Sequence, residues 1–381
     1  MHLGHIWTAR HIKEELKLDK LYMVVAADPP HKPNAQRLSG QVRYRMLDAA
    51  LKDEDGIFPS DVELKREGKS FTVDTLSFYK GQYRGAELFL IVGGDMLENF
   101  PHWREPERIL KLASLAAVGR PDEKRDMRTI ADDIEARFGG RVILSDYTGP
   151  DISSTEIRRR MYEARPVDTL VTRSTELYMC ENAIYMPQEL IEIKQKLAKV
   201  LKKRRLTHTM LTACEAVKLA ARFGADTKKA RLAGILHDCA KLPNNELVEF
   251  CDRNMYDITD EEREFPYLIH ARLGAYFAEE EYGVKDPEIL SAIRNHTLGC
   301  VGMSLLDKII YVADKIEPSR EYEGLDEMRK AAYEDLNLGM LLVIKHSADY
   351  TLKSGREVNP STKAVIEYLE NEIKKQEEHN G

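Results

Sequence analysis

The sequence has no run of about 18 consecutive apolar residues, the length with which a helix crosses a membrane, and it lacks the N-terminal pattern of a secretory signal. It has no excess of positive charge either. The formal net charge of −7 and the isoelectric point near 6.0 argue against broad nucleic-acid binding. We therefore expect a soluble, cytoplasmic protein that binds neither membranes nor nucleic acids.

Cysteine is also scarce. The five cysteines are odd in number, scattered along the chain and without CxxC spacing. This pattern gives little support to a zinc finger and is typical of reduced thiols in a cytoplasm. The five are Cys180, Cys214, Cys239, Cys251 and Cys300.

The apolar pattern of the first 150 residues predicts an α/β Rossmann-like domain with a parallel sheet. Short apolar runs, bounded by Gly, Pro or Asp, alternate there with helical stretches. The expected strands are 21–27, 88–94, 114–120 and 141–146, and the expected helices include 41–52, 72–80 and 106–112.

The second half of the chain has a different character, which predicts two domains. A chain of 381 residues is longer than a domain with a single hydrophobic core usually is. After Pro187 only helical periodicity remains, with breakers at Gly224, Gly283 and Pro287. We therefore expect an α/β domain over residues 1–186 and an all-α helical bundle over residues 187–381.

Two candidate phosphate-binding stretches lie near the N-terminus. His2 and His5 flank a glycine where a helix is expected to begin, so that imidazoles, backbone N–H groups and the helix dipole can meet phosphate oxygens. The stretch AADPPHKPN (26–34) follows an expected strand, where α/β sheets place ligand loops, and its Lys32 attracts phosphate. Taken alone, PPHKP could equally be a rigid turn.

Two further stretches extend this pattern. IVGGDMLENFPHW (91–103) has a glycine pair, Asp95 and Trp103 after a buried strand. DISSTEIRRRM (151–161) is typical of a helix N-terminus, where Ser154, Thr155 and Arg158 suit an anion such as a triphosphate. Each also has an ordinary interpretation, the hydroxyls as a helix cap and the tryptophan as a packing residue.

The order and spacing of these motifs, together with SFTVDT (70–75), resembles the bacterial nicotinate-nucleotide adenylyltransferases over residues 1–186. The resemblance implies that ATP and nicotinate mononucleotide are joined to deamido-NAD with release of pyrophosphate. It also implies that Mg²⁺ accompanies the triphosphate. Such a reaction depends on positioning and charge stabilisation and needs no covalent intermediate on the enzyme.

The resemblance further implies roles for individual residues. His2 and His5 are expected at the ATP phosphates as catalytic groups. The residues expected to hold ATP are Lys32, Gly93, Asp95, Ser154, Thr155 and Arg158. The residues expected beside the nicotinate nucleotide are Thr72, Asp74 and Trp103, the last stacked on the pyridine ring.

One element of that family is absent before His2. In the family a strand ending in a GGTFDP-like loop directly precedes the HxGH turn, and a doubly wound sheet places such a strand in its middle. Without it two strands keep unpaired backbone groups, which cost about 1–3 kcal/mol each if buried. We expect the true start of the coding sequence to lie upstream of Met1, so that it encodes this strand. The alternative is an N-terminally truncated domain that is catalytically weak or only binds or senses nucleotides.

Histidines and aspartates recur in short motifs of the helical half. His237 and Asp238 are adjacent on an expected helix, so they converge on one ion only if other helices complete the site. Imidazole and carboxylate ligands suit Fe, Mn or Zn without deciding among them, and two such ions would clamp a phosphoryl group. The candidate metal ligands are His208, His237, Asp238, His270, His296 and Asp314.

This pattern, followed by ADKIEPSR (313–320), resembles the HD-domain metallophosphohydrolases and within them the YqeK-type symmetrical diadenosine tetraphosphate hydrolases, over about residues 190–375. The resemblance implies hydrolysis of diadenosine tetraphosphate to two ADP at a divalent metal centre, with iron favoured. It makes His270 and His296 the ligands of a second metal. Asp238 and Lys241 are expected to be catalytic and Arg320 to bind substrate, whereas Asp307 is either a further contact or simply a helix residue.

We therefore interpret the chain as a bifunctional nucleotide enzyme whose small-molecule partners are ATP, nicotinate mononucleotide, deamido-NAD, diadenosine tetraphosphate and ADP. Alternatively, only the HD half is active and acts on another nucleotide, such as a nucleoside monophosphate or a cyclic dinucleotide. The sequence does not decide which metal is bound, whether the chain forms a homo-oligomer or whether the two activities are coupled.

Overall fold

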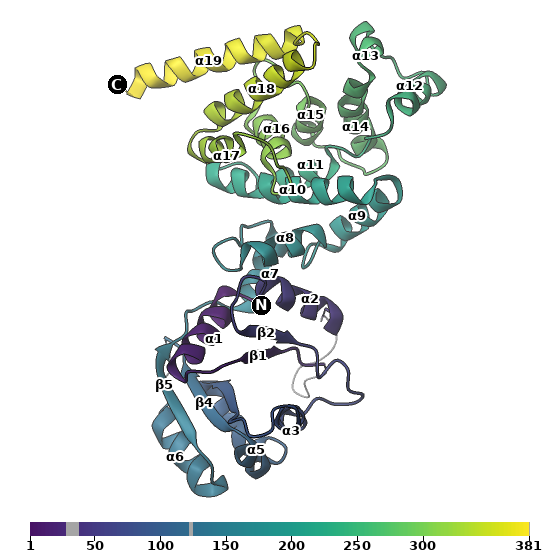
Figure 1. Cartoon of the computed structure of the whole chain (residues 1–381). Coiled ribbons are helices and arrows are strands. Elements are labelled where there is room, and N and C mark those ends of the chain that lie inside the picture. The colour runs from purple at the N-terminus through teal and green to yellow at the C-terminus, as the bar shows by residue number, and fades with distance from the viewer. Residues whose placement is uncertain (28–37, 122–124, 381) are drawn as a thin grey trace. The chain divides into compact units, whose positions relative to one another are not determined.

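The computed structural model describes residues 1–27, 38–121 and 125–380 (Figure 1). It divides into two compact units. The first comprises residues 1–157 with 168–178, and the second comprises residues 158–167 with 179–381. The single boundary between residues 186 and 187 that the sequence suggests stays a prediction.

The first unit contains two parallel sheets. Strand β1 (Leu21–Val24) pairs with β2 (Ile57–Ser60), and β3 (Phe89–Gly93), β4 (Ser114–Gly119) and β5 (Val142–Thr148) form a three-stranded sheet in that order. The α/β prediction is thereby confirmed. Strands β1, β3 and β4 lie within the expected runs, and β5 begins in the expected run 141–146 and continues two residues beyond it. Strand β2 was not expected because it has only four residues and includes Pro59.

The two sheets share apolar packing. Ile91 of β3 packs against the buried cluster that includes Leu21 and Val25 at β1. In the described part of the chain, β1 and β3 each have a hydrogen-bonded strand on one side only. The family resemblance expects a further strand in this region, and that expectation stays a prediction.

Helices cover these sheets. Helix α2 packs against β2, α6 packs against β5 and α1 contacts β5. The main buried cluster joins the strands β3 and β4 to α4, α5 and α6 through apolar side chains such as Leu97, Ile109 and Ile134. The helices are α1 (Leu3–Glu15), α2 (Gly40–Ala50), α3 (Thr72–Gln82), α4 (Gly94–Asn99), α5 (Pro106–Leu112) and α6 (Met127–Phe138).

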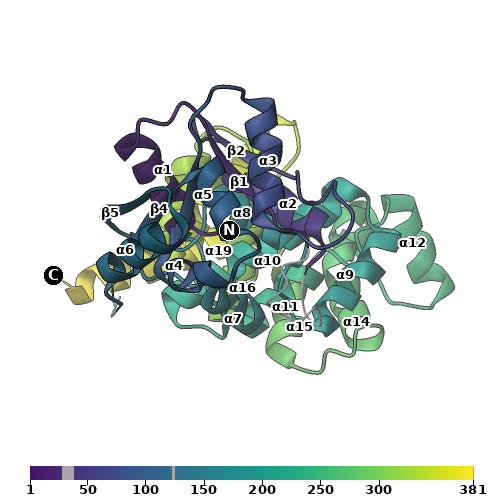
Figure 2. The same cartoon turned by 90° about the horizontal axis from the view of Figure 1, so that it is seen from below.

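The described residues of the second unit form helices joined by turns and loops, with no strand among them, which confirms the all-α prediction. Helices α7 (Ser154–Glu163) and α8 (Arg173–Glu181) each contribute residues to both units. Both views place α12 and α14 side by side at one end of this unit (Figure 1, Figure 2). The remaining helices are α9 (Gln188–Val200), α10 (Lys203–Phe223), α11 (Thr227–Leu236), α12 (Asn244–Arg253), α13 (Asp260–Glu264), α14 (Ile269–Glu280), α15 (Pro287–Asn295), α16 (Leu305–Ile316), α17 (Leu325–Glu334), α18 (Leu336–Lys353) and α19 (Pro360–Asn380).

Helices α10 and α11 approach each other unusually closely because α11 carries a glycine at their contact. A Cβ atom on Gly234 would lie 2.6 Å from Ala213 Cα and 3.0 Å from Ala213 N. Asp226 caps the start of α11 by accepting from the backbone N–H groups of Lys228 and Lys229. The Asp226 cap therefore fixes the start of α11, and Gly234 lets the end of α11 lie close to α10.

The prediction that all cysteines are reduced is wrong for one pair. Cys180 on α8 and Cys214 on α10 form a disulfide, with Cα atoms 6.2 Å apart, although 34 positions separate them in the sequence. Their spacing gave no sign of this because the pairing depends on how α8 packs against α10. Cys239, Cys251 and Cys300 are free thiols.

Among the described residues, no helix combines the length and the apolar character needed to cross a membrane.

Candidate functional site

The HxGH motif lies at the first turn of α1, which begins at Leu3, inside the motif rather than after it. The rings of His2 and His5 lie with their centroids 3.7 Å apart. Burial, reinforced by the nearby His5, lowers the pKa of His2 to about 3. Its Nδ1 atom is buried and has no hydrogen-bond partner in the described part of the chain. The neutral His2 ring therefore keeps an unused polar atom at a helix N-terminus.

The start of α7 lies close to this motif within the first unit. A Cβ atom on Gly4 would lie 3.2 Å from Pro150 Cγ, so the chain leading to α7 packs directly on the HxGH turn. Ser153 then caps α7 by accepting from the backbone N–H of Glu156 at 3.1 Å. Ser154 and Thr155 follow in the first turn of α7, and Arg158 lies one turn further on.

The other predicted residues of this half are distributed over two helix starts and the segment after α4. Thr72 and Asp74 lie in the first turn of α3, whereas Gly93 ends β3 and Asp95 lies exposed in the first turn of α4. Trp103 is half-buried and packs on Phe100 with ring centroids 5.5 Å apart. Lys32 lies outside the described residues.

The six candidate metal ligands of the helical half come together from five segments, and all six are buried. His208 lies on α10, His270 in the first turn of α14, and Asp314 near the end of α16. His296 follows the last residue of α15. The prediction that His237 and Asp238 lie on a helix is wrong. Both residues lie in the turn that follows α11. The turn lets both side chains face the same site.

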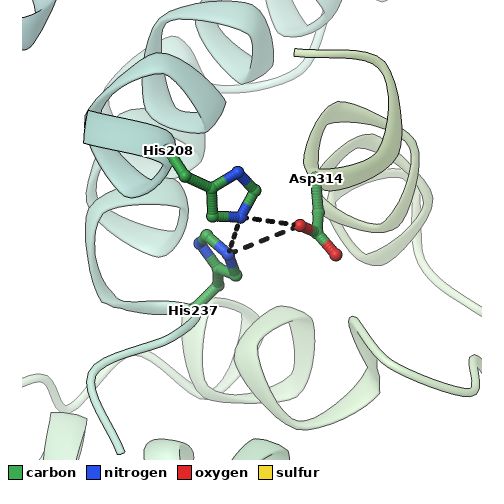
Figure 3. A group of neighbouring side chains, drawn as sticks. All are labelled: His208, His237 and Asp314. Atoms are coloured by element: carbon green, nitrogen blue, oxygen red, sulfur yellow. Dashed lines mark hydrogen bonds and ion pairs between the residues drawn. The ribbon is translucent and has the colours of Figure 1, made fainter. Parts of the chain in front are cut away.

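His208, His237 and Asp314 form one group of converging ligand atoms (Figure 3). His208 Nε2 lies 2.9 Å from Asp314 Oδ1 and 3.3 Å from His237 Nε2, and His237 Nε2 lies 3.7 Å from Asp314 Oδ1. Ligand atoms that share an ion at roughly 2 Å have separations of this size. The donor set and its spacing therefore fit a transition-metal ion.

A second group shares one residue with the first. It consists of His237, Asp238 and His296, and His270 lies beside it with its Nε2 3.2 Å from His296 Nε2. Asp238 directs its two oxygens differently. Oδ1 lies 3.5 Å from His270 Nε2 and 3.7 Å from His296 Nε2, whereas Oδ2 lies 3.6 Å from His237 Nε2. A carboxylate in this arrangement is suited to contact two ions.

The ring nitrogens explain why these groups attract a cation. His237 Nδ1 donates to Gly234 O at 2.7 Å, and burial lowers the pKa of His237 to about 3, so the ring is neutral. Its Nε2 lone pair then faces a second imidazole nitrogen and two carboxylates. Buried lone pairs and negative charges that face one another are unfavourable without a cation between them, and a metal ion would supply that charge.

Cationic side chains surround the two aspartates. Arg320 Nη2 donates to Asp314 Oδ1 at 2.7 Å, and Lys315 donates to Asp314 Oδ2. Arg205 Nη1 donates to Asp238 Oδ2 at 2.7 Å. Burial raises the pKa of both carboxyls, but it is outweighed at Asp314 by Lys315 and the hydrogen bond with His208. At Asp238 it is outweighed by His237, His296 and Lys241, so that both pKa values lie well below their usual range. Both aspartates are therefore ionised ligands.

Two further predicted residues can be located at this site. Lys241 Nζ lies 3.0 Å from His270 Nε2, and burial lowers the pKa of Lys241 to about 8. Asp307 instead closes a capping box with Ser304 at the start of α16. The sequence prediction missed Arg205 and Glu317, although Arg205 lies three residues before the predicted ligand His208 and Glu317 lies in the motif ADKIEPSR. Glu317 Oε1 lies 3.0 Å from His208 Nδ1.

Comparison with known families finds one match in the N-terminal half of the chain and another in the C-terminal half. A family model described as cytidylyltransferase-like matches residues 1–160, and a model of the HD domain matches residues 205–319. An HD domain with this buried donor set implies a divalent metal.

Three curated relatives span one half or nearly all of the chain. The symmetrical bis(5'-nucleosyl)-tetraphosphatase of Bacillus subtilis is 42% identical over 180 residues, which are 46% of this chain and 93% of that protein. A probable nicotinate-nucleotide adenylyltransferase of Shouchella clausii is 34% identical over 184 residues, which are 48% of this chain and 90% of that protein. A probable nicotinate-nucleotide adenylyltransferase/Ap4A hydrolase of Mycoplasma pneumoniae is 29% identical over 355 residues, covering 91% of this chain and 95% of that protein.

Proposed function

Because the chain belongs to the nicotinate-nucleotide adenylyltransferases through its N-terminal half and to the symmetrical bis(5'-nucleosyl)-tetraphosphatases through its C-terminal half, we propose that it is a bifunctional nucleotide enzyme. One activity transfers the adenylyl group of ATP to nicotinate mononucleotide, giving deamido-NAD and pyrophosphate. The other hydrolyses diadenosine tetraphosphate (Ap4A) to two ADP. Both reactions use nucleotides of the cytoplasm, where we propose that the protein acts.

The observation that carries the hydrolase proposal is the buried pair of ligand groups that share His237. When bound there, divalent ions would act as Lewis acids toward a phosphate oxygen and make a water molecule a stronger nucleophile. Asp238 would help to hold the divalent metal, since its two oxygens face different histidines. Arg320 and Lys241 would bind the oxygens of the polyphosphate and stabilise the negative charge that grows as the central P–O bond breaks.

Iron is the metal that we propose for this centre. Four imidazole and two carboxylate ligands form a mixed nitrogen and oxygen set, which suits iron and also accepts manganese or zinc. Metal analysis of the chain purified without chelators and without air tests the choice. Iron bound at one or two ions per chain supports it, and an exclusive zinc or manganese content contradicts it.

For the adenylyltransferase we propose that the HxGH turn and the start of α7 hold the triphosphate. His2 and His5 would stabilise the charge that develops on the α-phosphate during attack by the mononucleotide phosphate. Ser154, Thr155 and Arg158 would bind the remaining phosphates together with Mg²⁺. The close packing of Gly4 on Pro150 supports this proposal, since it brings the two motifs together within the first unit.

The same proposal gives the remaining predicted residues their places. Lys32 would add a phosphate contact, and Gly93 and Asp95 would lie beside the ATP ribose and adenine. Thr72 and Asp74 would contact the nicotinate nucleotide. Trp103 already packs on Phe100, and its exposed part would stack on the pyridine ring.

A pair of variants in the full chain tests both activities at once. His237→Ala is expected to abolish Ap4A hydrolysis and keep pyrophosphate release from ATP and nicotinate mononucleotide, and His2→Ala is expected to do the reverse. Each variant then serves as the control for the other. Absence of either activity from the wild-type chain, supplied with Mg²⁺ and with the HD-site metal, would overturn the corresponding half of the proposal.

A further inference from the structure

The four histidines of the metal centre are oriented in two different ways. Three of them donate Nδ1 to the backbone carbonyl three residues earlier: His237 to Gly234, His296 to Ile293 and His270 to Tyr267. His208 is the exception, because its Nδ1 lies 3.0 Å from the carboxylate oxygen Oε1 of Glu317, 109 positions further along the chain.

Helix geometry explains this exception. His237 and His296 follow the last residues of α11 and α15, where backbone carbonyls lack a partner within the helix. His208 lies inside α10, which runs for 21 residues from Lys203 to Phe223. The carbonyls that precede it are used in the helix itself. An acceptor for His208 Nδ1 must therefore come from another element, and the end of α16 supplies it.

Glu317 is held firmly in this position. Its side chain is fully buried, and it accepts from Ser319 N at 2.6 Å and from Ser319 Oγ at 2.5 Å. Its own carbonyl accepts from Arg329 Nη2 at 3.1 Å, while Arg329 Nε donates to Ile316 O at 3.0 Å. A carboxylate is costly to bury, so this set of donors indicates a fixed geometry rather than an incidental contact.

One turn of chain therefore approaches both ring nitrogens of His208. Asp314 Oδ1 lies 2.9 Å from Nε2, and Glu317, three residues later, lies 3.0 Å from Nδ1. A histidine whose Nδ1–H donates to a carboxylate keeps its other nitrogen free as a ligand and becomes a stronger electron donor.

Resting on the proposed metal-dependent hydrolase, we propose that Glu317 is a positioning residue that fixes His208 as the Nδ1–H tautomer and directs Nε2 to the metal. Glu317 touches neither the ion nor the substrate and acts only through His208. The sequence motif ADKIEPSR then has two functions, since it delivers the ligand Asp314 and the group that orients the ligand His208.

The test is metal affinity in the full chain, measured with Co²⁺ alone and followed by its visible absorption in competition with a chelator. Glu317→Gln keeps the size of the side chain and removes its charge, and it is expected to weaken Co²⁺ binding about 10–100-fold and to change the absorption spectrum. Glu321→Gln makes the same chemical change at an exposed position of the next turn. It is expected to leave affinity and spectrum unchanged. Equal Co²⁺ affinity and spectra for Glu317→Gln and the wild type would overturn the proposal.

A second measurement observes the wild type and needs no folded Glu317→Gln variant. Nitrogen NMR of histidine-labelled wild-type protein, with the His208 signals assigned by their loss in His208→Gln, reports which ring nitrogen carries the proton. The proposal expects a proton on Nδ1 of His208 in the Co²⁺-free and zinc-loaded protein, and a proton on Nε2 alone would overturn it. If the wild type binds no Co²⁺, the hydrolase proposal itself fails, which is a different result from normal binding with an unaffected Glu317→Gln variant.

Discussion

Replacing Gly234 by alanine is expected to push α11 away from α10 and thereby to separate His237 from His208. The new Cβ atom would lie 2.6 Å from Ala213 Cα and 3.0 Å from Ala213 N, and both atoms belong to a helix backbone. Ordinary contact needs about 3.5–4.0 Å between carbon atoms. The helices must therefore separate locally by about 1 Å, because neither atom is a flexible side-chain end.

The expected cost follows from this displacement. Overpacking of a closed interface costs about 1–3 kcal/mol of unfolding free energy. His237 follows Gly234 by three residues, and its Nε2 lies 3.3 Å from His208 Nε2. A shift of about 1 Å would spoil the shared coordination, and misplacement of that size costs about 100-fold in catalysis.

Two assays measure the effect: urea unfolding followed by circular dichroism, and Ap4A hydrolysis at saturating metal. Gly81→Ala is the matched control, since a Cβ at this position of α3 has no atom within 4 Å. That control is expected to keep hydrolysis unchanged and to leave stability equal or slightly higher. Wild-type stability together with wild-type Ap4A hydrolysis in Gly234→Ala would refute the idea that close helix contact sets the ligand geometry.

Three further outcomes are expected. Asp314→Asn should reduce Ap4A hydrolysis more than about 100-fold, beyond what an outer-shell partner contributes, while pyrophosphate release in the adenylyl-transfer assay stays normal; equal losses in both assays would contradict separate sites. Removing the metal with a chelator should lower the thermal midpoint, since a metal at 100 times its Kd stabilises the fold by about 2.7 kcal/mol; differential scanning calorimetry with and without metal checks this, and identical midpoints would count against a metal centre. Cys214→Ser should destabilise the chain by about 3–4 kcal/mol, because it opens the loop closed by Cys180. Urea unfolding measures that loss, and an unchanged midpoint together with five alkylatable thiols in the unreduced wild type would contradict the disulfide.

Some of this architecture was predictable from local sequence. The apolar runs at residues 88–94 and 114–120 became β3 and β4. The run of β4 is continuous because that strand is buried on both faces, from Leu115 to Val118. Gly224 marked the end of α10, since it takes a φ of 78° that suits glycine.

Other features depend on tertiary contacts and could not be predicted in this way. The approach of α10 to α11 rests on a single glycine, and the disulfide joins helices that no spacing rule pairs. The metal ligands were predictable because histidines and aspartates recur in short motifs of the helical half, and the structure buries all six. Glu317 did not stand out, since its role depends on the ring nitrogen of a histidine 109 positions away.

We propose that the helical half hydrolyses a dinucleoside tetraphosphate symmetrically at a centre built on His208, His237 and Asp314. The most direct test incubates the metal-loaded chain, and its His237→Ala variant, with Ap4A and separates the nucleotide products by chromatography. We expect ADP as the single product of the wild type and no product from the variant. ATP and AMP in equal amounts, or the same ADP release from the variant, would contradict the proposal.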